Sequence, residues 1–154
     1  MAVSSFYEQV LELESNLIAL ETSDVEAALV QYRLICRQTG RSIYHWSDNQ
    51  GMTSLKAADI SVPGCRKLVE ALRYIVQSMQ YGVYILTRYE RELRGPAVDY
   101  LRKVAAAEDD RKVILLGQQI ALPNSLEKLF HVVGEEQGET EAFRPRLRDG
   151  RWVV

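Results

Sequence analysis

The sequence has few of the features that mark secreted or membrane-inserted proteins. Its two cysteines, Cys36 and Cys65, lie in stretches that we expect to be helical, without C-x-x-C spacing, and they are typical of reduced thiols. No segment approaches the roughly 18 consecutive apolar residues of a membrane span. The first residues carry acidic side chains where a signal peptide would have a basic region and an apolar run. We therefore expect a cytoplasmic protein that does not insert into a membrane.

The sequence also lacks an excess of positive charge and a set of metal ligands. The formal net charge is -2 and the isoelectric point is about 5.8, which argues against a general nucleic-acid or anionic-membrane partner. Only two histidines are present, His45 and His131, and neither cysteine has ligand-like spacing to them. We expect both histidines to be partly buried strand residues. No catalytic triad, metal site or cofactor is predicted.

What is present favours one α/β domain with a charged tail. Hydrophobic residues make up 47% of the 154 residues, enough for a core of ordinary size. Most of the apolar or β-favouring runs are separated by helical patterns, which predicts a three-layer, doubly wound, mainly parallel sheet of about five strands. Antiparallel layouts fit this pattern poorly. The expected strands are 17–20, 42–46, 82–86, 112–116 and 129–133.

The helices are expected between these strands. A short amphipathic helix precedes the first strand at 5–15, and Ser23 with Glu26 forms an S-x-x-E capping pattern for the next helix, which ends near Gly40. Pro63 opens the following helix, which extends to Gln80. Later helices begin at 96 and 123, and the charged cluster 108–112 is expected to be the solvated exit of the former. We assign residues 1–133 to the domain and 134–154 to a tail that is mobile or docked on a partner.

This strand and helix order resembles a P-loop fold without its phosphate loop. No G-x-x-x-x-G-K-[ST] or G-x-G-x-x-G motif occurs, and the first strand is followed by E-T-S-D-V-E, whose carboxylates would repel a polyphosphate. The third strand runs into Thr87-Arg88-Tyr89-Glu90, without the Asp that would hold magnesium. Glu90 is better explained as an exposed carboxylate at a helix start. We therefore do not expect nucleotide hydrolysis.

Two surfaces are candidates for binding. In open parallel sheets, ligands bind at the carboxyl ends of the strands, and the polar residues that follow the strands predict a crevice there. Tyr and Arg, which are enriched at protein interfaces, gather around the third strand, although core tyrosines beside a solvated basic helix would give the same pattern. The crevice residues are Glu21, Thr22, Asp48, Arg88 and Gln118. The candidate interaction surface is Tyr74, Arg88, Tyr89, Arg91, Arg94, Arg144, Arg146, Arg148 and Trp152.

Four stretches resemble the N-terminal, non-catalytic domain of chloroplast- and cyanobacterium-type AAA ATPases. They are LIALET, SIYHWSDNQGM, YGVYILTRYE and RKVILLGQQIALPNSLEKLFHVV, and together the resemblance spans about residues 6 to 133. It implies a degenerate P-loop-like module with a role in assembly. It carries over no functional residues, because the catalytic motifs of that family lie in an ATPase module that does not follow in this sequence.

The function expected from these features is a bacterial protein-interaction or adaptor module without catalysis, which regulates an ATPase or another complex in trans. Self-association is compatible with such a module. The alternative is a sensor that binds a small ligand or nucleotide at the carboxyl end of the sheet without hydrolysing it.

Overall fold

The computed structural model describes residues 2–57, 60–79, 81–134, 147–148 and 151–152. Within this part of the chain, six strands form one sheet in the order β3-β2-β4-β5-β1-β6. All neighbouring pairs are parallel except β2 with β3. The strands of this sheet are β1 (Leu17–Glu21), β2 (Ile43–Ser47), β3 (Gly51–Ser54), β4 (Val83–Leu86), β5 (Lys112–Gly117) and β6 (His131–Gly134).

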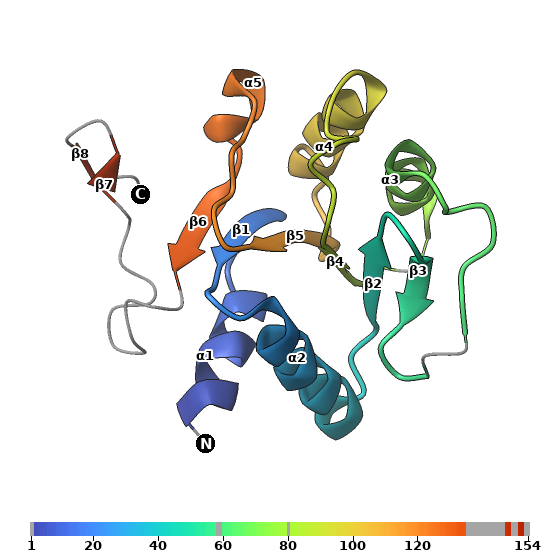
Figure 1. Cartoon of the computed structure of the whole chain (residues 1–154), viewed down its shortest axis with the longest axis vertical. Helices are drawn as coiled ribbons and strands as arrows, with labels where there is room; N and C mark the ends of the chain where they lie inside the picture. Colours follow the sequence, from blue (N-terminus) through green and yellow to red (C-terminus); the bar gives the residue numbers. More distant parts are fainter. Residues whose placement is uncertain (1, 58–59, 80, 135–146, 149–150, 153–154) are drawn as a thin grey trace.

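Helices cover both faces of the sheet, as predicted for a three-layer α/β fold (Figure 1). One face is packed by α1 (Ala2–Leu11) and α2 (Val25–Thr39), and the other by α3 (Leu68–Gln77), α4 (Pro96–Ala105) and the single turn α5 (Asn124–Glu127). Alternation along each strand divides the core between the two faces, since successive side chains point to opposite sides. In β1, Leu17 and Ala19 face α3 and α4, whereas Ile18 and Leu20 face α1 and α2.

The edge strand β3 raises the strand count of the sheet from the expected five to six, and the sheet is mainly parallel as expected. β3 pairs antiparallel with β2 in the register Ser47 to Gly51, and Gly51 has a φ of 73° that closes the hairpin. The following segment crosses the outer edge of β3, where Val62 N–H donates to Met52 O at 2.9 Å. This hydrogen bond and the bridge between Thr53 and Ser61 hold residues 60–62 along the edge of β3.

Two helix starts also differ from the expected ones. α3 begins at Leu68 rather than at Pro63, because the buried Trp46 indole donates to the Cys65 carbonyl at 2.9 Å and holds that stretch in a loop. The cap of α2 is Asp24 rather than Ser23, and Gly40 ends α2 in the left-handed conformation as expected. The last strand of the sheet covers residues 131–134 instead of 129–133.

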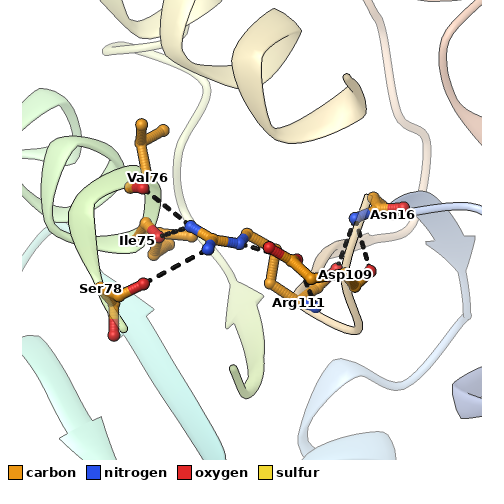
Figure 2. A network of polar contacts seen from close by, with 6 residues as sticks. All are labelled: Asn16, Ile75, Val76, Ser78, Asp109 and Arg111. Carbon is orange, nitrogen blue, oxygen red and sulfur yellow. Dashed lines mark hydrogen bonds and ion pairs between the residues drawn. The ribbon is translucent and has the colours of Figure 1, made fainter. Parts of the chain in front are cut away.

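Arg111, directly before β5, ties this strand to the carboxyl end of α3 (Figure 2). Its Nη1 donates to the carbonyls of Ile75 at 2.6 Å and Val76 at 2.8 Å, and Nη2 donates to the carbonyl of Ser78 at 3.3 Å. Its Nε donates to the Asp109 carboxylate at 2.9 Å. A cation at this position satisfies the terminal carbonyls and complements the helix dipole.

The next residue, Lys112, ties the start of β5 to the connection between α1 and β1. Its ammonium donates to the carbonyls of Leu13 at 2.6 Å and Ser15 at 2.7 Å, and only 7% of the residue is exposed. Asn16 reinforces this junction by donating to the Arg111 carbonyl at 2.9 Å. The expectation that this charged cluster is solvated is therefore wrong for Arg111 and Lys112, which are held by backbone carbonyls.

A second, separate pair of strands lies in the tail. β7 (Leu147–Arg148) and β8 (Arg151–Trp152) pair antiparallel, with Arg148 opposite Arg151. Arg144 and Arg146 lie outside the described residues.

Candidate functional site

A cleft of about 790 Å³ opens at the carboxyl edge of the sheet, where β1, β4 and β5 end. The connection after β1 leads to α2 on one face, and the connection after β5 leads to α5 on the other, so the chain diverges here as ligand crevices of doubly wound sheets require (Figure 1). The cleft is lined by Ser23, Val25, Glu26, Thr87, Arg88, Glu90, Leu116, Gly117, Gln118 and Gln119.

The β1–α2 connection stands where a phosphate loop would lie, and it is closed by its own side chains. Asp24 Oδ1 accepts a hydrogen bond from Ala27 N–H at 3.0 Å, which caps α2 with a carboxylate. Glu21 Oε2 accepts from Ile120 N–H at 3.1 Å, and Thr22 N–H donates to the Gly117 carbonyl at 2.9 Å. Negative charge at a helix start repels phosphate, so the site disfavours a polyphosphate at this position.

Arg88 links the ends of β2 and β4 beside the cleft. Its Nε donates to Asp48 Oδ1 at 2.8 Å, and the side chains are 66% and 23% exposed. Among the described residues, Arg88 alone of the non-glycine residues has a positive φ, at 53°. An exposed ion pair contributes little stability, so it does not by itself explain this backbone geometry. A strained residue beside a cleft is a reason to look for function there.

His45 and Thr87 form a polar pair between β2 and the end of β4. The His45 Nε2 and Thr87 Oγ1 atoms are 2.7 Å apart. Burial, with a smaller contribution from the positive charge of Arg33, lowers the pKa of His45 to about 4, and burial with nearby Lys112 also lowers the pKa of His131. His45 is therefore neutral near pH 7 and positions the Thr87 hydroxyl at the wall of the cleft.

The predicted crevice residues do not all reach the cleft. Arg88 and Gln118 line it, and Gln118 also bridges its two sides by donating to the Ser23 carbonyl at 3.2 Å. Asp48 lies next to the cleft through its ion pair with the lining residue Arg88. Glu21 accepts a hydrogen bond from Ile120, which directly follows the lining residue Gln119. Thr22 is fully buried, so its place in the crevice is wrong, because its backbone continues the pairing of β1 with β5.

Other residues line the cleft close to strand ends but are not among the five predicted crevice residues. Ser23 and Glu26 follow β1, and Gln119 follows β5. Glu90 also lines the cleft, in a turn rather than at a helix start. Their short separation in sequence from the strand ends is the signal in the sequence that indicates a place at the cleft.

The candidate interaction surface is divided in the same way. Arg91 and Arg94 are exposed and line a second groove of about 460 Å³ beside the start of α3. Tyr74 is half-buried against the core. Tyr89 is only 1% exposed, so its place on the surface is wrong: it packs in the core under α3 and α4, where burial raises its pKa. Arg148 and Trp152 fall in β7 and β8.

The part of the chain that the structure describes holds no group of three or more His, Cys, Asp or Glu residues arranged for a metal ion. Cys36 and Cys65 are free and buried. Within the same part, no helix has the length and apolar character needed to cross a membrane.

The fold and the cleft define a doubly wound α/β module of P-loop-like layout whose phosphate-loop position is occupied by a short acidic connection. The chain belongs to the family of SpoVK-like AAA ATPase N-terminal domains, whose model matches residues 8–134. This confirms the resemblance to an AAA ATPase N-terminal domain. Comparison with curated proteins and with solved structures gives no match.

Proposed function

We propose that this chain is a non-catalytic protein-interaction or adaptor module that acts with an AAA-type ATPase in the bacterial cytoplasm. The observation that carries the proposal is the β1–α2 connection, where Asp24 caps the helix and Glu21 holds the Ile120 amide. An ATP-binding site of the P-loop type uses this position for phosphate. Membership in a family of ATPase N-terminal domains supports a role beside the ATPase rather than in hydrolysis.

Affinity capture from native cells tests this function. We expect a tagged full-length chain to recover an AAA ATPase that control beads do not recover, and the purified chain to hydrolyse no ATP above the buffer rate. ATP hydrolysis that disappears when Glu90, a carboxylate that lines the cleft just after β4, is changed to Gln would refute the proposal.

The segment 134–154 is part of the same proposal, as a docking element. Its support is that the family match ends at residue 134 while the charged sequence continues beyond it. Affinity capture with the whole 154-residue chain and with a chain ending at residue 134 measures how much of the partner's recovery depends on this segment. Equal recovery of the partner would remove the docking role from this segment.

A second candidate function is supported by the cleft itself. Its volume of about 790 Å³ suits a small molecule, and Arg88 holds a left-handed conformation at its wall. We propose as the alternative that the chain senses a small ligand or nucleotide there without hydrolysis. A thermal-shift screen tests this, since a ligand at a hundredfold excess over its Kd stabilises by about 2.7 kcal/mol. No stabilisation by any nucleotide would count against the nucleotide version.

A further inference from the structure

A groove of about 460 Å³ lies between the first turn of α3 and the β4–α4 connection, and its lining residues differ from those of the carboxyl-edge cleft. Its basic lining comes from Lys67, Arg91 and Arg94. Val69 and Pro96 add apolar surface to the same groove. A concave surface with an apolar floor and charged walls has the general form of a peptide-binding groove.

The cations of this groove form no ion pairs in the described part of the chain. Lys67, Arg91 and Arg94 are exposed, and none of them takes part in the ion pairs found there. The groove also contains Glu92, but its Oε1 accepts a hydrogen bond from Leu68 N–H at 2.8 Å and is thereby committed to the start of α3. Three cations thus face one carboxylate that already has a partner.

Two amides at the start of α3 are bonded to carboxylates of the chain itself. Glu70 Oε1 accepts from Lys67 N–H at 3.0 Å, and Glu92 accepts from Leu68 N–H. The exposed cations Lys67, Arg91 and Arg94 supply the positive charge that would attract a ligand to this groove.

The walls of the groove are preformed. Glu92 ties the β4–α4 connection to α3, and Leu93, in the same connection, is packed in the core at 9% exposure. Gly95 takes a φ of 61°, and Pro96 starts α4 with a fixed backbone angle. A rigid groove spends little conformational entropy on binding.

We propose that this groove binds an acidic segment of a partner protein, with carboxylates on Lys67, Arg91 and Arg94 and an apolar side chain against Val69 and Pro96. Charge complementarity selects this occupant, because three unpaired cations favour carboxylates and the apolar floor favours a peptide over a bare anion. This inference rests on the proposed interaction function and assigns its contact site.

Fluorescence anisotropy with the purified full chain tests the groove. The probe is a short synthetic peptide of alternating Glu and Leu carrying fluorescein. One comparison peptide replaces Glu by Lys, another replaces Leu by Ser, and a labelled single-stranded DNA serves as the nucleic-acid arm. The groove variant is Arg91→Glu with Arg94→Glu. The matched control is Arg37→Glu with Arg102→Glu, which changes the net charge equally at exposed positions of α2 and α4.

We expect the Glu-Leu peptide to bind the groove variant at least about tenfold more weakly than the unaltered chain, a change of about 1.4 kcal/mol. The control should stay within about twofold, since exposed charges at a distance are screened. Arg91→Gln with Arg94→Gln should give an intermediate loss and guards against misfolding of the doubly reversed variant. In NMR spectra, the amides of Val69 and Gly95 should shift on binding.

Several results would overturn the proposal that the groove binds an acidic segment. They are equal weakening by both charge-reversal variants, equal binding of the Lys-Leu peptide, tighter binding of DNA through Arg91 and Arg94, or shifts confined to Ser23 and Gln118 in the cleft. Partner capture from cells separates this failure from that of the function. If the groove variant recovers the partner at the full yield, the contact lies elsewhere and the interaction function stands. If the unaltered chain recovers no partner from cells while the Glu-Leu peptide still binds, the proposed interaction function fails and the assignment of the groove as a peptide-binding site stands.

Discussion

Replacing Arg111 by Met should destabilise the whole domain, although Arg111 lies at the amino edge of the sheet, opposite the cleft. The substitution keeps the length of an apolar stem and removes the guanidinium from the carbonyls of Ile75, Val76 and Ser78 (Figure 2). The Arg111 side chain is only 10% exposed, so water replaces these bonds incompletely. The carbonyls at the end of α3 would then lack donors.

The magnitude follows from the number and charge of the bonds lost. A hydrogen bond from a charged group contributes about 1.5 to 3 kcal/mol. Counting only the two shorter bonds, at 2.6 and 2.8 Å, at the lower value gives a loss of about 3 kcal/mol. For a domain of this size, the melting temperature should fall by about 6 to 12 °C. Arg111→Lys should lie between, because one ammonium cannot reproduce the planar fork of donors.

Urea unfolding followed by circular dichroism measures this loss. The control is Arg102→Met, an identical substitution at an exposed site on α4, which should change the free energy of unfolding by less than about 0.5 kcal/mol. A loss for Arg111→Met no larger than that of the control would refute the reasoning, since it would mean that the carbonyls of α3 are satisfied without Arg111.

Three further perturbations test other parts of the fold by urea unfolding. The pKa of His45 is lowered from 6.5 to about 4, so on acidification the unfolded chain takes up the proton before the folded chain does. The free energy of unfolding should therefore fall by up to about 3 kcal/mol as the pH drops from 6.5 to 4. In the His45→Gln variant, the free energy of unfolding should depend less on pH over this range. Asp24→Ala removes the side-chain cap of α2 and should cost about 1 kcal/mol, whereas an unchanged midpoint would argue against that cap. Gly51→Ala should cost more than Gly40→Ala: both have φ near 74°, but only at Gly51 does a Cβ meet a backbone atom, the Cys65 carbonyl oxygen at 3.3 Å.

The central strands could be predicted because their apolar runs report burial on both faces. Residues 17–20 and 112–116 are almost wholly buried in β1 and β5, and helices separate them in the chain as a parallel arrangement requires. The edge strand Gly51–Ser54 gave no such signal. It contains a glycine and two short polar residues, and its strand conformation depends on pairing with β2 on one side and with the segment around Ser61 on the other. Tertiary contacts of this kind are not visible in local sequence.

The site residues were harder to predict, because the type of a residue does not tell whether its side chain points to the surface or into the core. Arg88 and Tyr89 are adjacent and both are types enriched at interfaces, yet Arg88 faces the cleft and Tyr89 is in the core. In the same way, Arg111 and Lys112 have the composition of a solvated turn, but carbonyls from distant segments accept their donors. What separates these neighbours is the partner that the fold brings to each.

The connection between β1 and α2, at the carboxyl edge of the sheet, lacks what a P-loop needs to bind phosphate. Only Thr22, Ser23 and Asp24 connect the end of β1 to α2, which is too short a loop to wrap a phosphate with successive backbone amides. The carboxylates of this connection also have structural tasks, since Asp24 caps α2 and Glu21 holds the Ile120 amide. Restoring a phosphate site would therefore require a longer, glycine-containing loop and a new cap for α2 rather than one substitution. The strands β1 and β5 would not need to change, because their buried side chains pack against the helices whatever the loop contains, and this independence lets the sheet persist while its edge serves another purpose.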